Sequence, residues 1–146
     1  MEFEELKQDL LDRAKKANAC QGGYRMGLNA KSKIDLLNAI TKNWFWVLRS
    51  SKIIDANYLE ENFTEEELAE AGIYTRKEHV VRTATFACGS ATVKAYDSAT
   101  VEAYENSYIE DCTEMIRPKS DFAIVKDYYN HKIYIKKGKF EIIEVE

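Results

Sequence analysis

The sequence predicts an α+β protein: an N-terminal small helical subdomain packed on a short parallel β-solenoid (β-roll) of octad repeats and closed by a C-terminal β-hairpin. Residues 83–114 form four tandem octads, TATFACGS, ATVKAYDS, ATVEAYEN and SYIEDCTE. A fixed period indicates one unit stacked on its copies. The chain before the octads has helical periodicity, and the chain after them has strand-like runs. We expect one compact unit with a helical region at 1–74, the octads at 75–116 and a cap at 117–146.

Apolar residues recur at three- and four-residue spacing over residues 3–18, which predicts an amphipathic helix. Gly22 and Gly23 should end it. Ser32 is a favourable N-cap for a second helix, whose apolar stripe runs to the aromatic cluster Trp44-Phe45-Trp46. Trp44 is expected in the core, with Phe45 or Trp46 packing on a neighbouring helix; the alternative is that Trp46 is an exposed anchor for a partner.

Two shorter helices complete this region. The segment Asp55 to Phe63 predicts the first of them. Thr64 and Glu67 have the spacing of a capping box and predict the start of the second, which should end at Gly72.

Within the octads, small apolar residues alternate with polar ones, which is the pattern of a half-buried strand. Ala91, Val93 and Ala95 should face inward, because Lys94 occupies the opposite set. With two octads per turn of the solenoid, residue i stacks on residue i+16, so Val93 should stack on Ile109. An antiparallel meander is the alternative, although the octads lack the Asn-Gly or Asp-Gly turns typical of tight hairpins.

The same register makes two further predictions about the outer side of the strands. Lys94 should lie beside Glu110 as an opposite-charge pair. The sixth octad position holds Cys88, Tyr96, Tyr104 and Cys112 in turn, and we expect these side chains on the solvent side or rim of the strands.

Charge is unevenly distributed although the net charge is only −4. Residues 52–70 hold seven carboxylates against one lysine, and residues 94–114 hold six against one. Residues 117–139 reverse the sign, with seven basic residues against two acidic ones. Such an acidic stripe is either a solvated face or a docking surface for a basic partner. The candidate partner-binding residues are Glu60, Glu61, Glu65, Glu66, Glu102, Glu105, Tyr96, Tyr104 and Trp46.

No pattern for catalysis or for cofactor or metal binding stands out. The three cysteines lack CxxC spacing, which favours free thiols in a cytoplasmic protein. The two histidines are isolated from other metal ligands, and no phosphate-binding or nucleophile motif occurs. Asp111 occupies an inward octad position, which is a weak candidate for a catalytic carboxylate. We expect no cofactor, no membrane span and no direct nucleic acid binding.

The octads ATVKAYDS and ATVEAYEN, after a helical region that contains GLNAKSKIDLLNAITKNWFW, resemble those of a group of phage and mobile-element proteins from gut anaerobes. The similarity covers nearly the whole chain and brings no catalytic residue with it. It implies a mobile-element setting, in which small accessory proteins often block host defence machinery.

Three functions follow as hypotheses. The favoured one is a non-enzymatic protein-binding accessory protein of a phage or mobile element, acting on a host defence system as an anti-CRISPR-like inhibitor whose acidic surface blocks a basic nucleic-acid channel. The second is a phage structural or assembly protein with a β-solenoid. An enzyme is the third, disfavoured because four octads give about 10 Å of solenoid, too short for a long catalytic groove. We expect a monomer or dimer in the host cytoplasm.

Overall fold

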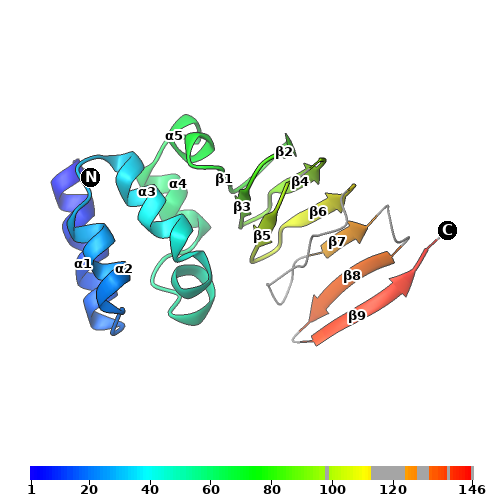
Figure 1. Ribbon diagram of the computed structural model, residues 1–146, viewed down its shortest axis with the longest axis horizontal. Coiled ribbons are helices and arrows are strands. Elements are labelled where there is room, and N and C mark those ends of the chain that lie inside the picture. The colour runs from blue at the N-terminus through cyan, green and yellow to red at the C-terminus, as the bar shows by residue number, and fades with distance from the viewer. Residues whose placement is uncertain (98, 113–123, 128–131, 138, 146) are drawn as a thin grey trace. The chain divides into compact units, whose positions relative to one another are not determined.

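The computed structural model combines helices and strands, which confirms the α+β class (Figure 1). It describes residues 1–97, 99–112, 124–127, 132–137 and 139–145. The chain divides into two compact units, Met1–Ala71 and Gly72–Glu146.

The first unit is helical. Its elements are α1 (Phe3–Lys16), α2 (Gln21–Leu28), α3 (Lys33–Lys42), the π-helical turn η1 (Trp46–Ser50), α4 (Ala56–Asn62) and α5 (Glu65–Glu70). The predicted caps are confirmed: the Ser32 hydroxyl accepts the Asp35 N–H at 3.3 Å and begins α3. Thr64 and Glu67 form the complete capping box of α5. These caps satisfy backbone N–H groups that helix geometry leaves without a partner.

Helix α2 corrects one prediction, because Gly22 and Gly23 lie in its first turn instead of interrupting the chain. Glycine costs a helix interior roughly 1 kcal/mol relative to alanine, so packing must favour it here. A Cβ on Gly23 would lie 3.3 Å from Asn43 Oδ1, and one on Gly27 would lie 3.2 Å from Leu11 Cδ2. The glycines therefore permit a close approach of α2 to its neighbours, which overrides their low helix propensity.

The core of the helical unit contains the predicted apolar stripe. Leu6, Leu37, Trp44 and Leu59 are almost completely buried. The prediction for Trp44 is therefore confirmed, while Phe45 beside it is 53% exposed.

Gly72 ends the helical region with a positive φ of 77°. A side chain there would bring its Cβ to 3.0 Å from the Ala84 carbonyl oxygen. Both the left-handed backbone and this close approach require glycine.

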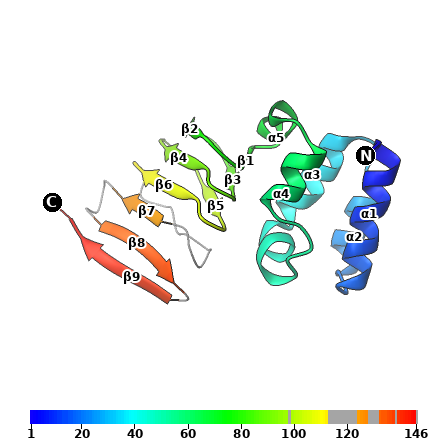
Figure 2. The ribbon, with the colours of Figure 1, turned by 180° about the vertical axis from the view of Figure 1, so that it is seen from behind.

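The second unit consists of two small sheets, and successive strands alternate between them from β1 to β6 (Figure 1, Figure 2). One sheet has the order β1-β3-β5 and the other β2-β4-β6-β7-β8-β9. The strands are β1 (Ile73–Tyr74), β2 (Glu78–Val81), β3 (Thr85–Ala87), β4 (Thr92–Ala95), β5 (Val101–Ala103), β6 (Tyr108–Asp111), β7 (Ile124–Asp127), β8 (Lys132–Lys137) and β9 (Lys139–Glu144).

Parallel pairing at a separation of sixteen residues is confirmed. Val93 pairs with Ile109 between β4 and β6, and Thr85 pairs with Val101 between β3 and β5. The antiparallel meander of neighbouring octads is therefore wrong. The same register continues into β7, where Ile109 pairs with Val125. This ladder of stacked parallel strands therefore extends one strand beyond the four octads, and β8 and β9 add antiparallel pairs to the same sheet.

Small apolar side chains from both sheets share one core, as predicted. Ala91, Val93 and Ala95 are fully buried, and they cluster with Val101 and Ala103. The turns of the octads repeat as well: the seventh position has positive φ in Gly89 (63°), Asp97 (56°) and Glu105 (61°). The eight-residue period therefore specifies a backbone turn as well as a strand.

Some predicted features lie in parts of the chain that the structure does not describe. The end of the fourth octad and the first residues of the cap, 113–123, lie outside the described residues. In the strand register, Asp111 pairs with Ala95 and with Asp127. The prediction that its side chain points inward also lies outside the described residues.

Candidate functional site

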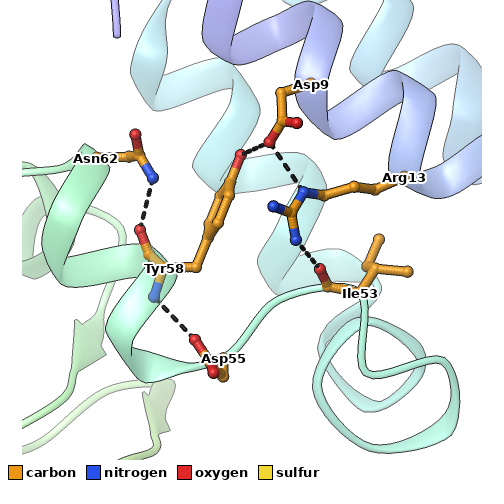
Figure 3. A network of polar contacts seen from close by, with 6 residues as sticks. All are labelled: Asp9, Arg13, Ile53, Asp55, Tyr58 and Asn62. Atoms are coloured by element: carbon orange, nitrogen blue, oxygen red, sulfur yellow. Dashed lines mark hydrogen bonds and ion pairs between the residues drawn. The ribbon is translucent and has the colours of Figure 1, made fainter.

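A polar network ties together separate parts of the helical unit (Figure 3). The Tyr58 hydroxyl on α4 donates to Asp9 Oδ2 on α1 at 2.6 Å, and Arg13 Nε donates to the same oxygen at 2.9 Å. Arg13 Nη1 also donates to the Ile53 carbonyl at 2.8 Å. The Arg13 guanidinium lies 4.5 Å from the centroid of the Tyr58 ring, a cation–π contact. We call Asp9, Arg13 and Tyr58 the clamp.

The clamp holds two helices together through hydrogen bonds. Burial, followed by the hydrogen bond to Asp9, raises the pKa of the Tyr58 hydroxyl well above its ordinary value of about 10. The hydroxyl therefore stays protonated and donates to the carboxylate at neutral pH. Such a group holds the α1–α4 contact and is a poor proton acceptor or donor for catalysis. Sequence reasoning missed the clamp, although the i,i+4 spacing of Asp9 and Arg13 was visible.

Carboxylates recur along the segment that contains α4 and α5. Asp55 caps α4 by accepting the Tyr58 N–H at 2.9 Å, and Lys33 Nζ lies 3.8 Å from Glu67 in the capping box of α5. Glu61, Glu65 and Glu66 are exposed. We define the acidic corner as Asp55, Glu60, Glu61, Glu65, Glu66 and Glu70, all of which belong to this unit. The positive end of the α5 dipole stabilises the acidic residues of its first turn.

The second acidic segment does not form a single stripe. Glu102 lies on β5 in one sheet and Glu110 on β6 in the other. Lys94 Nζ lies 2.9 Å from Glu78 and 3.7 Å from Glu110, so the predicted Lys94–Glu110 pair is confirmed. The hydrogen bond to Glu78, followed by the charges of Glu78 and Glu110, raises the pKa of Lys94. Lys126 follows Glu110 in the register and continues a column of alternating charge.

The carboxylates at the octad turns serve internal contacts too. Glu105 Oε2 accepts the Gly89 N–H at 2.7 Å, which joins two turns sixteen residues apart. Asp97 pairs with Arg82 at 2.6 Å. The candidate Glu105 is therefore engaged in a contact between two turns of the sheet unit.

The aromatic candidates are placed differently from one another. Tyr96 is half-buried, with the Arg82 guanidinium 5.3 Å from its ring centroid. Tyr104 is only 2% exposed, so the prediction of an outward Tyr104 on a binding surface is wrong. Cys88, sixteen residues earlier, is also buried, whereas Cys112 is exposed. Alternate octads enter different sheets, so the sixth position is buried after β3 and β5 and more open after β4 and β6.

Trp46 lines an apolar cavity of about 220 Å³ within the helical unit. Residues from α1, α2, α3 and η1 contribute to its wall, together with Ile53, whose carbonyl the clamp holds. Neither of the two predicted roles of Trp46 included a cavity. Sequence reasoning missed the site because its residues come from four segments with no common motif.

Within the described part of the chain, no group of three or more histidine, cysteine or carboxylate side chains is arranged to hold a metal ion. The same residues include no helix that is both long and apolar enough to cross a membrane. No protein-family model matches the chain, and neither a curated protein nor a solved structure matches it.

Proposed function

We propose that this protein is a non-enzymatic, protein-binding accessory protein of a phage or mobile element, and that it inhibits a host defence complex in an anti-CRISPR-like manner. The observation that carries the proposal is the acidic corner, where Glu61, Glu65 and Glu66 are exposed. A nucleic-acid channel binds phosphates through lysine and arginine, and an acidic protein surface complements such a channel. The octads, which resemble those of mobile-element proteins, support the same setting.

The acidic corner has features suited to docking. Its carboxylates stand on two short helices whose first turns are fixed by the Asp55 cap and by the Thr64–Glu67 box. Fixed backbone positions reduce the ordering cost of binding. Long-range attraction between opposite charges raises the association rate and weakens with added salt. We therefore expect an affinity that falls steeply with ionic strength.

The experiment is a charge-neutralising variant with a matched control. Glu61→Gln, Glu65→Gln and Glu66→Gln are combined in the test protein, and Glu2→Gln, Glu4→Gln and Glu5→Gln in the control. The control removes three exposed carboxylates at the start of α1, so the two variants have the same net charge. Circular dichroism and thermal denaturation check that both fold.

Each protein is expressed in a bacterium that carries an active DNA-targeting CRISPR nuclease, and transformation by a targeted plasmid is counted. We expect the wild type and the control to restore transformation and the corner variant to lose most of this protection. The purified wild type should also compete with target DNA for the nuclease complex, less well at higher salt. Equal protection by the corner variant and the control would overturn the role of the corner, and no protection by the wild type against a panel of defence nucleases would overturn the proposal.

A second candidate function is supported by the parallel strand pairs. We propose that the parallel parts of the two sheets are the faces of a short β-solenoid, because three strand pairs, β3–β5, β4–β6 and β6–β7, repeat at sixteen residues. Such solenoids serve as rigid parts of phage particles, which favours a structural or assembly role. Light scattering distinguishes the two candidate functions. A stable trimer would support the assembly role, and a monomer or dimer would support the inhibitor role.

A further inference from the structure

The cavity of the helical unit is half-open to solvent, and its wall is almost entirely apolar. Leu10 and Leu11 of α1, Leu36 and Ile40 of α3, and Val47 of η1 form its buried part. The residues nearer solvent include Tyr24 and Trp46, each partly exposed. A concave apolar site with few polar groups is the usual form of a small-molecule pocket.

The cavity exists because small residues occupy places where larger ones would fill it. Ala14 on α1, Gly23 on α2 and Ala39 on α3 line it, and all three are partly exposed. Protein interiors are normally close-packed, and unfilled apolar space costs stability roughly in proportion to its volume. Because this cavity is half-open, its apolar wall is exposed to water, and a bound apolar molecule would remove that surface from water.

A π-helical turn shapes one wall. The backbone N–H and the hydroxyl of Ser51 both bond to the Trp46 carbonyl, at 2.8 and 2.7 Å, and close the wide turn. This turn carries Trp46 and Val47, which both line the cavity. π-Helical turns are rare and are frequently found at functional sites. The turn is an observation independent of the apolar lining, and it places an aromatic ring at the pocket.

Asn43 supplies a polar group to the wall. Its Nδ2 donates to the Ala39 carbonyl at 2.8 Å and contacts Met26 Sδ at 3.8 Å, which fixes the orientation of the amide. Among the contacts of the described residues, Asn43 Oδ1 accepts no hydrogen bond. An amide oxygen so placed can accept an N–H or O–H from a bound molecule.

We propose that this cavity binds a small aromatic molecule of about the size of indole, with one hydrogen-bond donor directed at Asn43 Oδ1. Size supports this class, because an apolar protein cavity of about 150 Å³ binds benzene and the present one is about 220 Å³. The rings of Tyr24 and Trp46 offer stacking or edge-to-face partners for an aromatic ligand. The clamp supports the site, because Arg13 holds the carbonyl of the wall residue Ile53.

Binding is tested with indole and with benzene as probes, by titration calorimetry and by ligand-observed NMR on the full chain. Ala39→Leu fills the cavity, and Ala69→Leu on the exposed side of α5 is the matched control. We expect indole to bind the wild type and the control alike and to bind Ala39→Leu at least about tenfold more weakly, a loss of about 1.4 kcal/mol. Asn43→Leu should weaken indole more than benzene, which has no donor.

A second measurement does not require a substitution in the wall of the cavity. Cys20 lines the cavity and is exposed, so its alkylation by iodoacetamide in a Cys112→Ser protein reports on access to the pocket. Indole should slow this alkylation in proportion to its occupancy. The proposal is overturned if indole neither binds nor slows alkylation, or if Ala39→Leu binds it unchanged. Binding of N-acetyltryptophanamide about tenfold tighter than indole would also overturn it, in favour of an aromatic side chain of a partner protein.

Discussion

Val93→Ala offers the sharpest test of the inside–outside assignment in the ladder. Val93 is fully buried, pairs with Ile109 and lies in the core shared by the two sheets. The substitution removes two carbons at about 0.8 kcal/mol each, or about 1.6 kcal/mol. The space left between closely spaced sheets adds about 1 kcal/mol more. We expect a total loss of about 2.5 kcal/mol.

Thr92→Ala is the matched control, because it also replaces a β-branched residue by alanine one position along the same strand. Thr92 lies on the outer side and is partly exposed, so its loss should cost at most about 1 kcal/mol. Urea unfolding followed by far-UV circular dichroism measures both free energies. In thermal unfolding, Val93→Ala should lower Tm by about 10–20 °C for a unit of this size.

The two tryptophans, Trp44 and Trp46, both belong to the helical unit, so their fluorescence provides a separate reading of that unit. If Val93→Ala destabilises the sheet unit, the unfolding transition detected by circular dichroism should therefore shift more than the transition detected by tryptophan fluorescence. Equal losses of stability for Val93→Ala and Thr92→Ala would refute the assignment, because a core position and an outer position cannot then be distinguished.

Three further predictions concern single side chains. Tyr58→Phe should lower the unfolding free energy of the helical unit by about 1–2 kcal/mol, because it removes a hydrogen bond to a carboxylate. Since the folded pKa of Tyr58 is raised, wild-type stability should also fall as the pH rises above about 10, and fluorescence-detected unfolding of Tyr58→Phe should show a smaller fall. Glu105→Ala should lose the bond to the Gly89 N–H, whereas Glu105→Gly should be about 1 kcal/mol more stable than Glu105→Ala in urea unfolding, because glycine relieves the left-handed backbone. A thiol reagent should react quickly with Cys20 and Cys112 of the native protein and with Cys88 only after unfolding.

Local signals explain the parts of the fold that could be predicted. Ser32 and the Thr64–Glu67 pair marked helix starts because capping depends on neighbours in the sequence. The sixteen-residue register followed from the octad period once two octads were assigned to each turn of a solenoid.

Nonlocal packing explains what the sequence did not show. Helix α2 forms despite three glycines because Gly23 and Gly27 allow close approach to neighbouring helices, which propensity alone does not express. Tyr104 and Tyr96 occupy the same octad position, yet only Tyr104 is buried, because alternate octads enter different sheets. The cavity was invisible for the same reason: its wall residues are brought together only by the packing of separate helices.

Two segments with similar numbers of charged residues can differ in how many of those charges a binding partner could reach. The two acidic segments have similar composition, with seven carboxylates against one lysine and six against one. In the sheets, β-pairing places Lys94 between Glu78 and Glu110 and uses Glu105 within a turn, so these charges have partners at short range. In the helical unit, the side chains of Glu61 and Glu66 are exposed on two capped helices. A basic partner that binds through charge should therefore respond to changes in the acidic corner far more than to the same changes at Glu102 and Glu110.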